Sequence, residues 1–61
     1  MNLLAIQSSL HAASMQAFAA HIYERDDPYE SRQRVHNALH YLREAAGKLG
    51  YRLVLEEGPK S

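Results

Sequence analysis

Apolar side chains recur at intervals of three and four residues along the first third of the chain. This periodicity places them on one side of an α-helix, where they form a continuous stripe. The stripe consists of Leu3, Ile6, Leu10, Ala13, Ala17 and Ala20. Asn2 precedes it and suits a helix N-cap, because its side-chain oxygen can accept a hydrogen bond from a free N–H of the first turn. The pattern predicts a helix over about residues 3–25.

A second helix is predicted over residues 28–49. The sequence RDDPYE contains three start signals, because Asp27 is a strong N-cap, Pro28 suits the first helical position and Glu30 stands where a capping-box carboxylate belongs. Gly50 is a stop signal, since glycine readily adopts the left-handed conformation that follows a helix. The apolar residues of this helix again form one stripe, which comprises Val35, Ala38, Leu39, Leu42, Ala46 and Leu49.

The connection between the two predicted helices is short, so they must lie side by side and antiparallel. The sequence therefore predicts an all-α fold, a single helical-hairpin domain over residues 1–61 with a tail from residue 50 onward. Two conformations are open for YRLVLE, residues 51–56. Its alternating pattern is typical of an extended strand, whereas Leu53 also fits the helical stripe and would carry the helix through Gly50 to about residue 57.

The first predicted helix carries a second apolar stripe, about 120° round from the first. A hairpin needs only one face of this helix, so the other is expected to contact another molecule, most economically a second copy in a four-helix bundle. Alanines permit close helix approach, and Met and Phe are typical interface anchors. The pattern leaves open which stripe pairs with the second copy. The residues expected at a partner or dimer interface are Leu4, Ile6, Leu10, Met15, Phe18 and Ile22.

A polar column runs between the two stripes. Gln7, Ser14 and His21 are seven residues apart and would lie above one another on the helix. Polar residues in an otherwise apolar contact often set register and partner choice. The alternative is that these three side chains simply meet solvent at the edge of the contact.

All charged side chains lie at or after Glu24, although the chain has seven basic and seven acidic residues. A surface helix normally keeps a charged, solvated face, so the uncharged first helix suggests that much of it meets protein. The alternative is that Ser, Gln and Ala form an adequate solvated face. The net charge is zero. Non-specific nucleic-acid binding requires an excess of basic residues, so nucleic acid is not the expected partner.

The length and composition favour a small protein that needs a partner. Sixty-one residues without cysteine make a small core with no disulfide or thiolate metal site, so self-association or another protein is expected to supply further burial. Polar residues interrupt the apolar stretch of residues 3–22, and no basic residue precedes it. These features argue against a membrane span or signal peptide and favour a soluble cytoplasmic protein.

His36 and His40 are the candidates for metal chemistry, because two histidines four residues apart lie on one face of a helix. They supply only part of a zinc coordination shell, and a third ligand would have to come from elsewhere, for example from His21 or Glu24 across the hairpin. We therefore expect no metal and no cofactor. The chain has no nucleophile elbow, phosphate-binding loop or carboxylate pair, so we also expect no enzyme.

The segment RQRVHNALHYLREAAGKLG, Arg32 to Gly50, resembles part of the small anti-quorum-sensing proteins of Pseudomonas phages. Those proteins are helical-hairpin dimers that bind and silence a host quorum-sensing transcription factor and a pilus-assembly ATPase. The likeness covers about a third of the chain and rests on Ala38, Leu39, Tyr41, Leu42, Ala45, Ala46, Leu49 and Gly50. It implies a class of function, that of a small dimeric inhibitor or adaptor.

The sequence thus favours a non-catalytic regulatory protein that binds and masks a larger protein through its first helix, in the manner of a phage-type inhibitor of a host regulator. Two alternatives belong to other classes. One is a histidine-based, metal-binding helical bundle. The other is a dimeric DNA-binding regulator whose tail strands form a ribbon.

Overall fold

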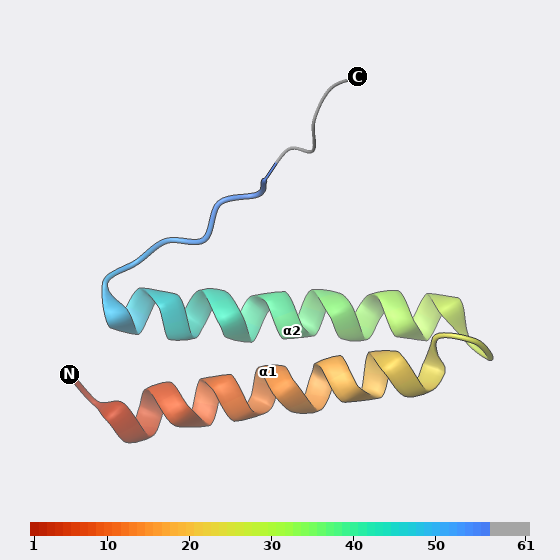
Figure 1. The fold of residues 1–61 in the computed structure, drawn as a ribbon, viewed down its shortest axis with the longest axis horizontal. Helices are drawn as coiled ribbons and strands as arrows, with labels where there is room; N and C mark the ends of the chain where they lie inside the picture. The colour runs from red at the N-terminus through yellow and green to blue at the C-terminus, as the bar shows by residue number, and fades with distance from the viewer. Residues whose placement is uncertain (57–61) are drawn as a thin grey trace.

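The chain folds as an antiparallel pair of helices. The structure, a computed structural model, describes residues 1–56. Helix α1 (Leu3–Tyr23) and helix α2 (Pro28–Leu49) lie side by side and are joined by a short turn (Figure 1). Residues 1–56 contain no strand. The predicted all-α helical hairpin is therefore confirmed.

Both helices begin at the residues that carry capping signals. The Oδ1 atom of Asn2 accepts a hydrogen bond of 3.1 Å from the N–H of Ala5, and the Oδ1 atom of Asp27 accepts one of 3.1 Å from the N–H of Glu30. Each bond satisfies a donor that the first helical turn leaves free. Local side-chain chemistry therefore determines where α1 and α2 start.

Helix α2 ends at a left-handed glycine. Gly50 has φ 89°, and the N–H of the following Tyr51 donates to the carbonyl oxygen of Ala46 at 2.8 Å. This closure satisfies carbonyl groups at the end of the helix and turns the chain away from its axis. The alternative in which α2 continues through Gly50 is wrong.

The interhelical contact consists almost entirely of small side chains. Its buried residues are Ile6, Ser9, Ala13 and Ala20 of α1 and Ala38 and Ala45 of α2. Alanine and serine let two helix backbones approach closely, and Ile6 is the one large side chain among these buried residues. The small-residue side of α1 therefore faces α2.

The large apolar residues of α2 lie beside this contact and not within it. The side chains are exposed to between 37% and 47% at Val35, Leu39, Leu42 and Leu49. Sequence periodicity groups them with Ala38 on one stripe, but only the small members of the stripe fit between the helices. The bulky members are displaced to one flank because the backbones are close.

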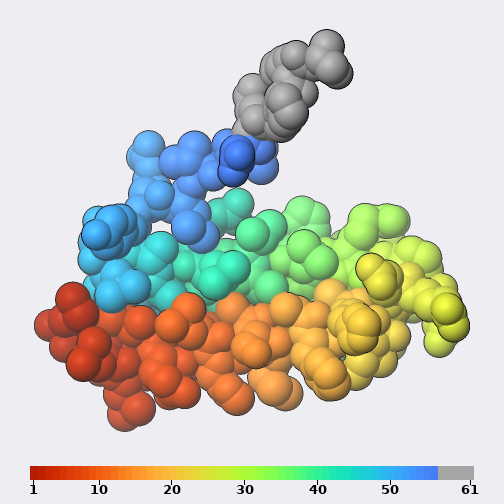
Figure 2. All heavy atoms as spheres, viewed as in Figure 1, coloured from red at the N-terminus to blue at the C-terminus, as the bar shows by residue number. Residues whose placement is uncertain are grey.

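The segment after Gly50 turns back over α2 and then diverges from it (Figures 1 and 2). Residues 51–56 form neither helix nor strand, and Leu53, Val54 and Leu55 line a shallow hollow together with Leu39 and Arg43 of α2. The strand alternative is therefore not realised within one chain. Residues 57–61, the rest of the predicted tail, lie outside the described residues.

Candidate protein-binding surfaces

The second apolar stripe of α1 faces away from α2. We name Leu4, Met15, Phe18 and Ile22 the outer stripe; these side chains are 76%, 54%, 60% and 56% exposed. At about 100° per residue they lie on the side of α1 opposite to its buried residues. The small residues of α1 therefore cover α2, and the outer stripe stays more than half exposed.

The other two residues of the predicted interface set have different environments. Ile6 is 5% exposed, so its side chain is taken up by the hairpin and offers almost no surface to another molecule. Leu10 is 46% exposed and lies beside the interhelical contact. The predicted set is therefore divided among three places on α1: the outer stripe, the buried contact and one flank.

The polar column of α1 is exposed to solvent. Gln7, Ser14 and His21 are all exposed, and their side chains make no hydrogen bond or ion pair to another residue in the range 1–56. They lie between the outer stripe and the flank that carries Leu10. A role in setting register would therefore require a second molecule.

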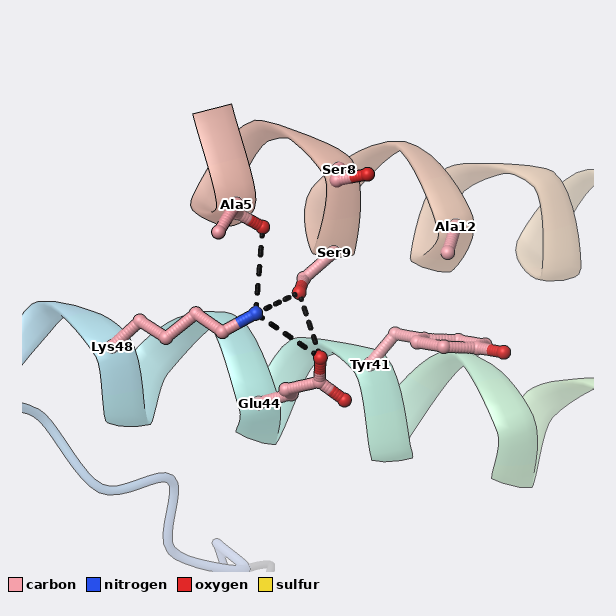
Figure 3. A pocket seen from close by; sticks show the side chains of 7 residues that line it. All are labelled: Ala5, Ser8, Ser9, Ala12, Tyr41, Glu44 and Lys48. Atoms are coloured by element: carbon pink, nitrogen blue, oxygen red, sulfur yellow. Dashed lines mark hydrogen bonds and ion pairs between the residues drawn. The ribbon is translucent and has the colours of Figure 1, made fainter. Parts of the chain in front are cut away.

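The polar side chains that do cross the hairpin are different ones, and the first group surrounds Ser9 (Figure 3). The hydroxyl of Ser9 donates to Oε1 of Glu44 at 3.1 Å. The Lys48 ammonium donates to Oγ of Ser9 at 3.0 Å, to Oε1 of Glu44 at 3.1 Å and to the carbonyl oxygen of Ala5 at 3.5 Å. Hydrogen bonds from Lys48 and then from Ser9 lower the pKa of Glu44. This cluster fastens the open end of α1 to α2.

Although serine and lysine are neighbours here, the arrangement does not activate a nucleophile. The Lys48 ammonium donates all three of its hydrogen bonds to oxygen atoms, and an ammonium has no acceptor with which to take the Ser9 proton. Ser9 itself is 5% exposed. The cluster is therefore structural, a satisfied polar group within a contact of alanines.

A second polar group fastens the other half of the hairpin. Oε1 of Gln16 accepts bonds of 3.3 Å from Nη1 of Arg34 and from Nδ2 of Asn37. The guanidinium of Arg34 is also paired with Glu30, with Nε 2.8 Å from Oε2, and lies 5.7 Å from the ring centroid of Tyr23. These contacts and the Ser9 cluster lie on the same flank of the hairpin, which we name the polar flank.

One signal in the sequence points to the polar contacts of Ser9 and Gln16. Ser9 lies three residues after Ile6 and four before Ala13, so it shares their side of the helix, and Gln16 follows Ser9 by seven residues. The column chosen from sequence, by contrast, is the one at Gln7. Both columns have the same spacing, and only the position of α2 distinguishes them.

The opposite flank of the hairpin is apolar. Each helix turns by about 100° per residue, so residues about 70° from the line of contact lie on one flank or the other. On the flank opposite to the polar one, both helices carry apolar residues. We name this surface the apolar face. It is made of Leu3, Leu10 and Ala17 of α1 and Val35, Leu39, Leu42 and Leu49 of α2, all exposed in the single hairpin.

The histidine pair lies in solvent. Both His36 and His40 are exposed; Nε2 of His40 is 3.8 Å from Oε2 of Glu44, and its ring packs edge-on against Tyr41 at 5.3 Å between centroids. Within residues 1–56, no three His, Asp or Glu side chains come together in a group that could hold a metal ion. The third ligand that the pair would need is not supplied across the hairpin.

Three comparisons with known proteins were made. A scan against protein-family models, a search of curated proteins and a search of solved structures each found no match. The resemblance of Arg32–Gly50 to the phage proteins therefore stays a prediction. In the described part of the chain, neither helix is long and apolar enough to cross a membrane.

Proposed function

We propose that the protein is a non-catalytic regulator that binds a larger protein through the outer stripe of α1 and thereby masks a functional surface of that partner. The outer stripe is the observation that carries the proposal. It consists of four large apolar side chains, each more than half exposed, on a helix without formal side-chain charge. Removing apolar surface from water yields about 25 cal/mol per Å², so a matching groove would bind this stripe favourably.

The geometry of the stripe suits a groove. Met15, Phe18 and Ile22 follow the spacing of three and four residues by which amphipathic helices present anchors to a hydrophobic groove. From Leu4 to Ile22 the stripe extends along about 27 Å of helix, at about 1.5 Å per residue. No charged side chain of α1 would lose water on binding. The expected partner surface is therefore an elongated apolar groove.

Helix α2 contributes by holding α1 in its helical form. An isolated helix of this length is only marginally stable in water. The hairpin fastens α1 to α2 through Ser9 near one end and through Gln16 and Ala20 near the other, where the hydroxyl of Ser31 donates to the Ala20 carbonyl oxygen at 2.8 Å. A preformed helix loses less conformational entropy on binding. Helix α2 therefore raises the affinity of the outer stripe for a partner, although it contributes no residue to the stripe.

The proposed role resembles that of a phage-type inhibitor of a host regulator, the class that the resemblance implies. The two alternatives have less support in the described residues. The histidine pair has no third ligand in residues 1–56, and residues 51–56 form no strand from which a DNA-binding ribbon could be built within the chain. No observation favours either of them over protein binding.

The test compares Phe18→Asp with Gln33→Asp. Both place one aspartate at an exposed helical position, but the second lies on α2, away from the outer stripe. The tagged wild-type protein and both variants are used for affinity purification from the native host, and the protein recovered is then purified and titrated against each variant. We expect the same partner to bind wild type and Gln33→Asp and to be lost with Phe18→Asp, at unchanged helicity by circular dichroism. Equal binding by Phe18→Asp would refute the proposal.

A further inference from the structure

The two helices share a heptad pattern of which the hairpin uses only half. In α1 the apolar stripe advances by three and four residues in strict alternation, and in α2 the same alternation runs from Ser31 to Leu49. The members buried between the helices are Ile6, Ala13 and Ala20 with Ala38 and Ala45. The intervening members of the pattern lie on the apolar face. They are Leu3, Leu10 and Ala17 in α1 and Val35, Leu42 and Leu49 in α2.

The register of the hairpin arranges these exposed residues in levels. The bonds from Lys48 to the Ala5 carbonyl and from Ser31 to the Ala20 carbonyl define which residues of α1 and α2 lie beside each other. Successive levels are seven residues apart, about 10.5 Å along the helices. The same register pairs Leu3 with Leu49, Leu10 with Leu42 and Ala17 with Val35.

A surface of this kind is half of a bundle core. In helical bundles, apolar residues at both positions of the heptad pack as knobs into holes of neighbouring helices, so each level needs side chains from the facing helices as well. In the single hairpin, Leu10 and Leu42 remain 46% and 38% exposed. A molecule that packs on the apolar face must therefore present apolar side chains at the same seven-residue interval.

The large side chains of the apolar face remain partly in water. Leu3 is 69%, Leu10 46%, Val35 47% and Leu49 42% exposed. Removing apolar surface from water stabilises an association by about 25 cal/mol per Å². Covering this face would therefore add apolar burial that the single hairpin does not provide.

The core between the two helices is small. The buried apolar residues are Ile6 and four alanines, and no large side chain is fully buried. A core of this size gives a short chain little stability by itself, and the chain has no cysteine for a disulfide. A second copy of the chain is present wherever the chain is made and carries the same heptad pattern, so it can cover the apolar face without any other molecule.

We infer that the apolar face binds a second copy of the chain in a two-fold four-helix bundle, with the two interhelical turns at opposite ends. In this arrangement Leu10 packs against Leu10 of the second copy at the centre, and Leu3 packs over the smaller Ala17 of the second copy. The opposite arrangement places both acidic turns, with Asp26 and Asp27, at one end and stacks leucines on leucines at the other. Large-over-small packing and charge separation both favour opposite ends.

This self-association goes beyond the proposed partner binding and does not depend on it, because the two use different surfaces of α1. The outer stripe and the apolar face occupy separate arcs of the helix. The bundle therefore leaves Met15 and Ile22 accessible on both copies, so that one dimer displays two outer stripes.

The first test is analytical ultracentrifugation of wild type, Leu10→Glu and the control Met15→Glu, which places the same charge on the outer stripe. We expect wild type and Met15→Glu to sediment as dimers and Leu10→Glu to dimerise roughly a hundredfold more weakly, because a carboxylate would be buried without a partner. A wild-type chain that is fully helical and monomeric up to millimolar concentration would overturn the inference. Dissociation by Met15→Glu in place of Leu10→Glu would do so too.

Cross-linking keeps the inference testable if Leu10→Glu does not fold. The native chain has no cysteine, so single cysteine variants report single contacts. We expect mild oxidation to convert Leu10→Cys, but not Met15→Cys, into a disulfide-linked dimer. If Leu10→Cys links only to Leu42→Cys in a mixture, the turns lie at the same end and the inferred arrangement is wrong. Phe18→Asp should stay dimeric, so loss of partner binding and loss of self-association are distinguishable.

Discussion

The closeness of α1 and α2 can be tested by enlarging one buried alanine. Ala45 is 2% exposed, the most buried of the core residues, and it lies on the line of contact with α1. The substitution Ala45→Leu adds three carbon atoms where the backbones approach. The side chain cannot turn toward solvent without leaving its rotamer, so the helices must separate and lose contacts along the alanine row.

The expected magnitude follows from the size of the chain. Overpacking of a well-packed contact typically costs about 1–3 kcal/mol, and a domain of this length has a total stability of roughly 3–9 kcal/mol. Each kcal/mol lowers the Tm of a small domain by about 4–8 °C. We therefore expect Ala45→Leu to lower Tm by roughly 4–24 °C.

The assay is thermal and urea unfolding followed by circular dichroism at 222 nm, with Ala46→Leu as the matched control. Ala46 is adjacent in sequence and only half-buried, so this control makes the same chemical change, with the same helix propensity, away from the line of contact. We expect Ala46→Leu to lose less stability than Ala45→Leu, because a larger side chain beside the contact does not force the helices apart. All proteins must be compared at one concentration, because self-association would make Tm concentration-dependent. If Ala45→Leu is as stable as wild type, close packing at Ala45 is refuted.

Three further predictions concern the helix ends and the Ser9 cluster. Gly50 has φ 89°, so Gly50→Ala should destabilise the hairpin by about 1–2 kcal/mol. A Cβ at the helical Gly47 meets nothing within 4 Å, so Gly47→Ala should stabilise the hairpin by about 0.5–1 kcal/mol. Urea titrations in which both variants change the stability in the same direction would contradict this. Asp27→Ala removes the α2 N-cap bond and should cost about 0.5–2 kcal/mol in the same assay, with Asp27→Asn retaining most of the stability. The pKa of Glu44 is lowered in the folded chain, so its contribution to stability is complete above the carboxyl pKa of the unfolded chain and is lost as pH falls through the folded-state pKa. Glu44→Gln should reduce this loss of stability at low pH. An unchanged dependence of stability on pH would show that the contacts of Glu44 contribute nothing.

Partner residues are harder to predict than helices because they depend on where the other helix lies. Leu4 and Leu10 are similar apolar residues of the same predicted helix, yet Leu4 lies on the outer stripe and Leu10 on the apolar face. Ile6 belongs to the expected interface by its pattern but is buried in the hairpin. The helical period assigns each residue an angle on α1 and carries no information about what occupies that direction.

The polar contacts show the same limitation. Gln7 and Ser9 are both polar residues in an apolar segment, and both begin columns with a spacing of seven. Ser9 is satisfied by Glu44 and Lys48 from α2, whereas Gln7 is exposed. Residues 35 or more positions apart in the chain meet in this cluster, and such a meeting cannot be foreseen from local spacing.

The two helices, their starts at the Asn2 and Asp27 caps and their antiparallel pairing through a short turn can be read from the sequence, because these features depend on interactions within a few residues. The stripe of α1 that packs on α2 depends on the packing of the two helices against each other. Two helix backbones in close contact accept alanine and serine between them and exclude leucine, phenylalanine and methionine. That steric selection turns two equivalent stripes into a buried contact and an exposed one, and it divides the leucines of α2 from the alanines with which they share a period.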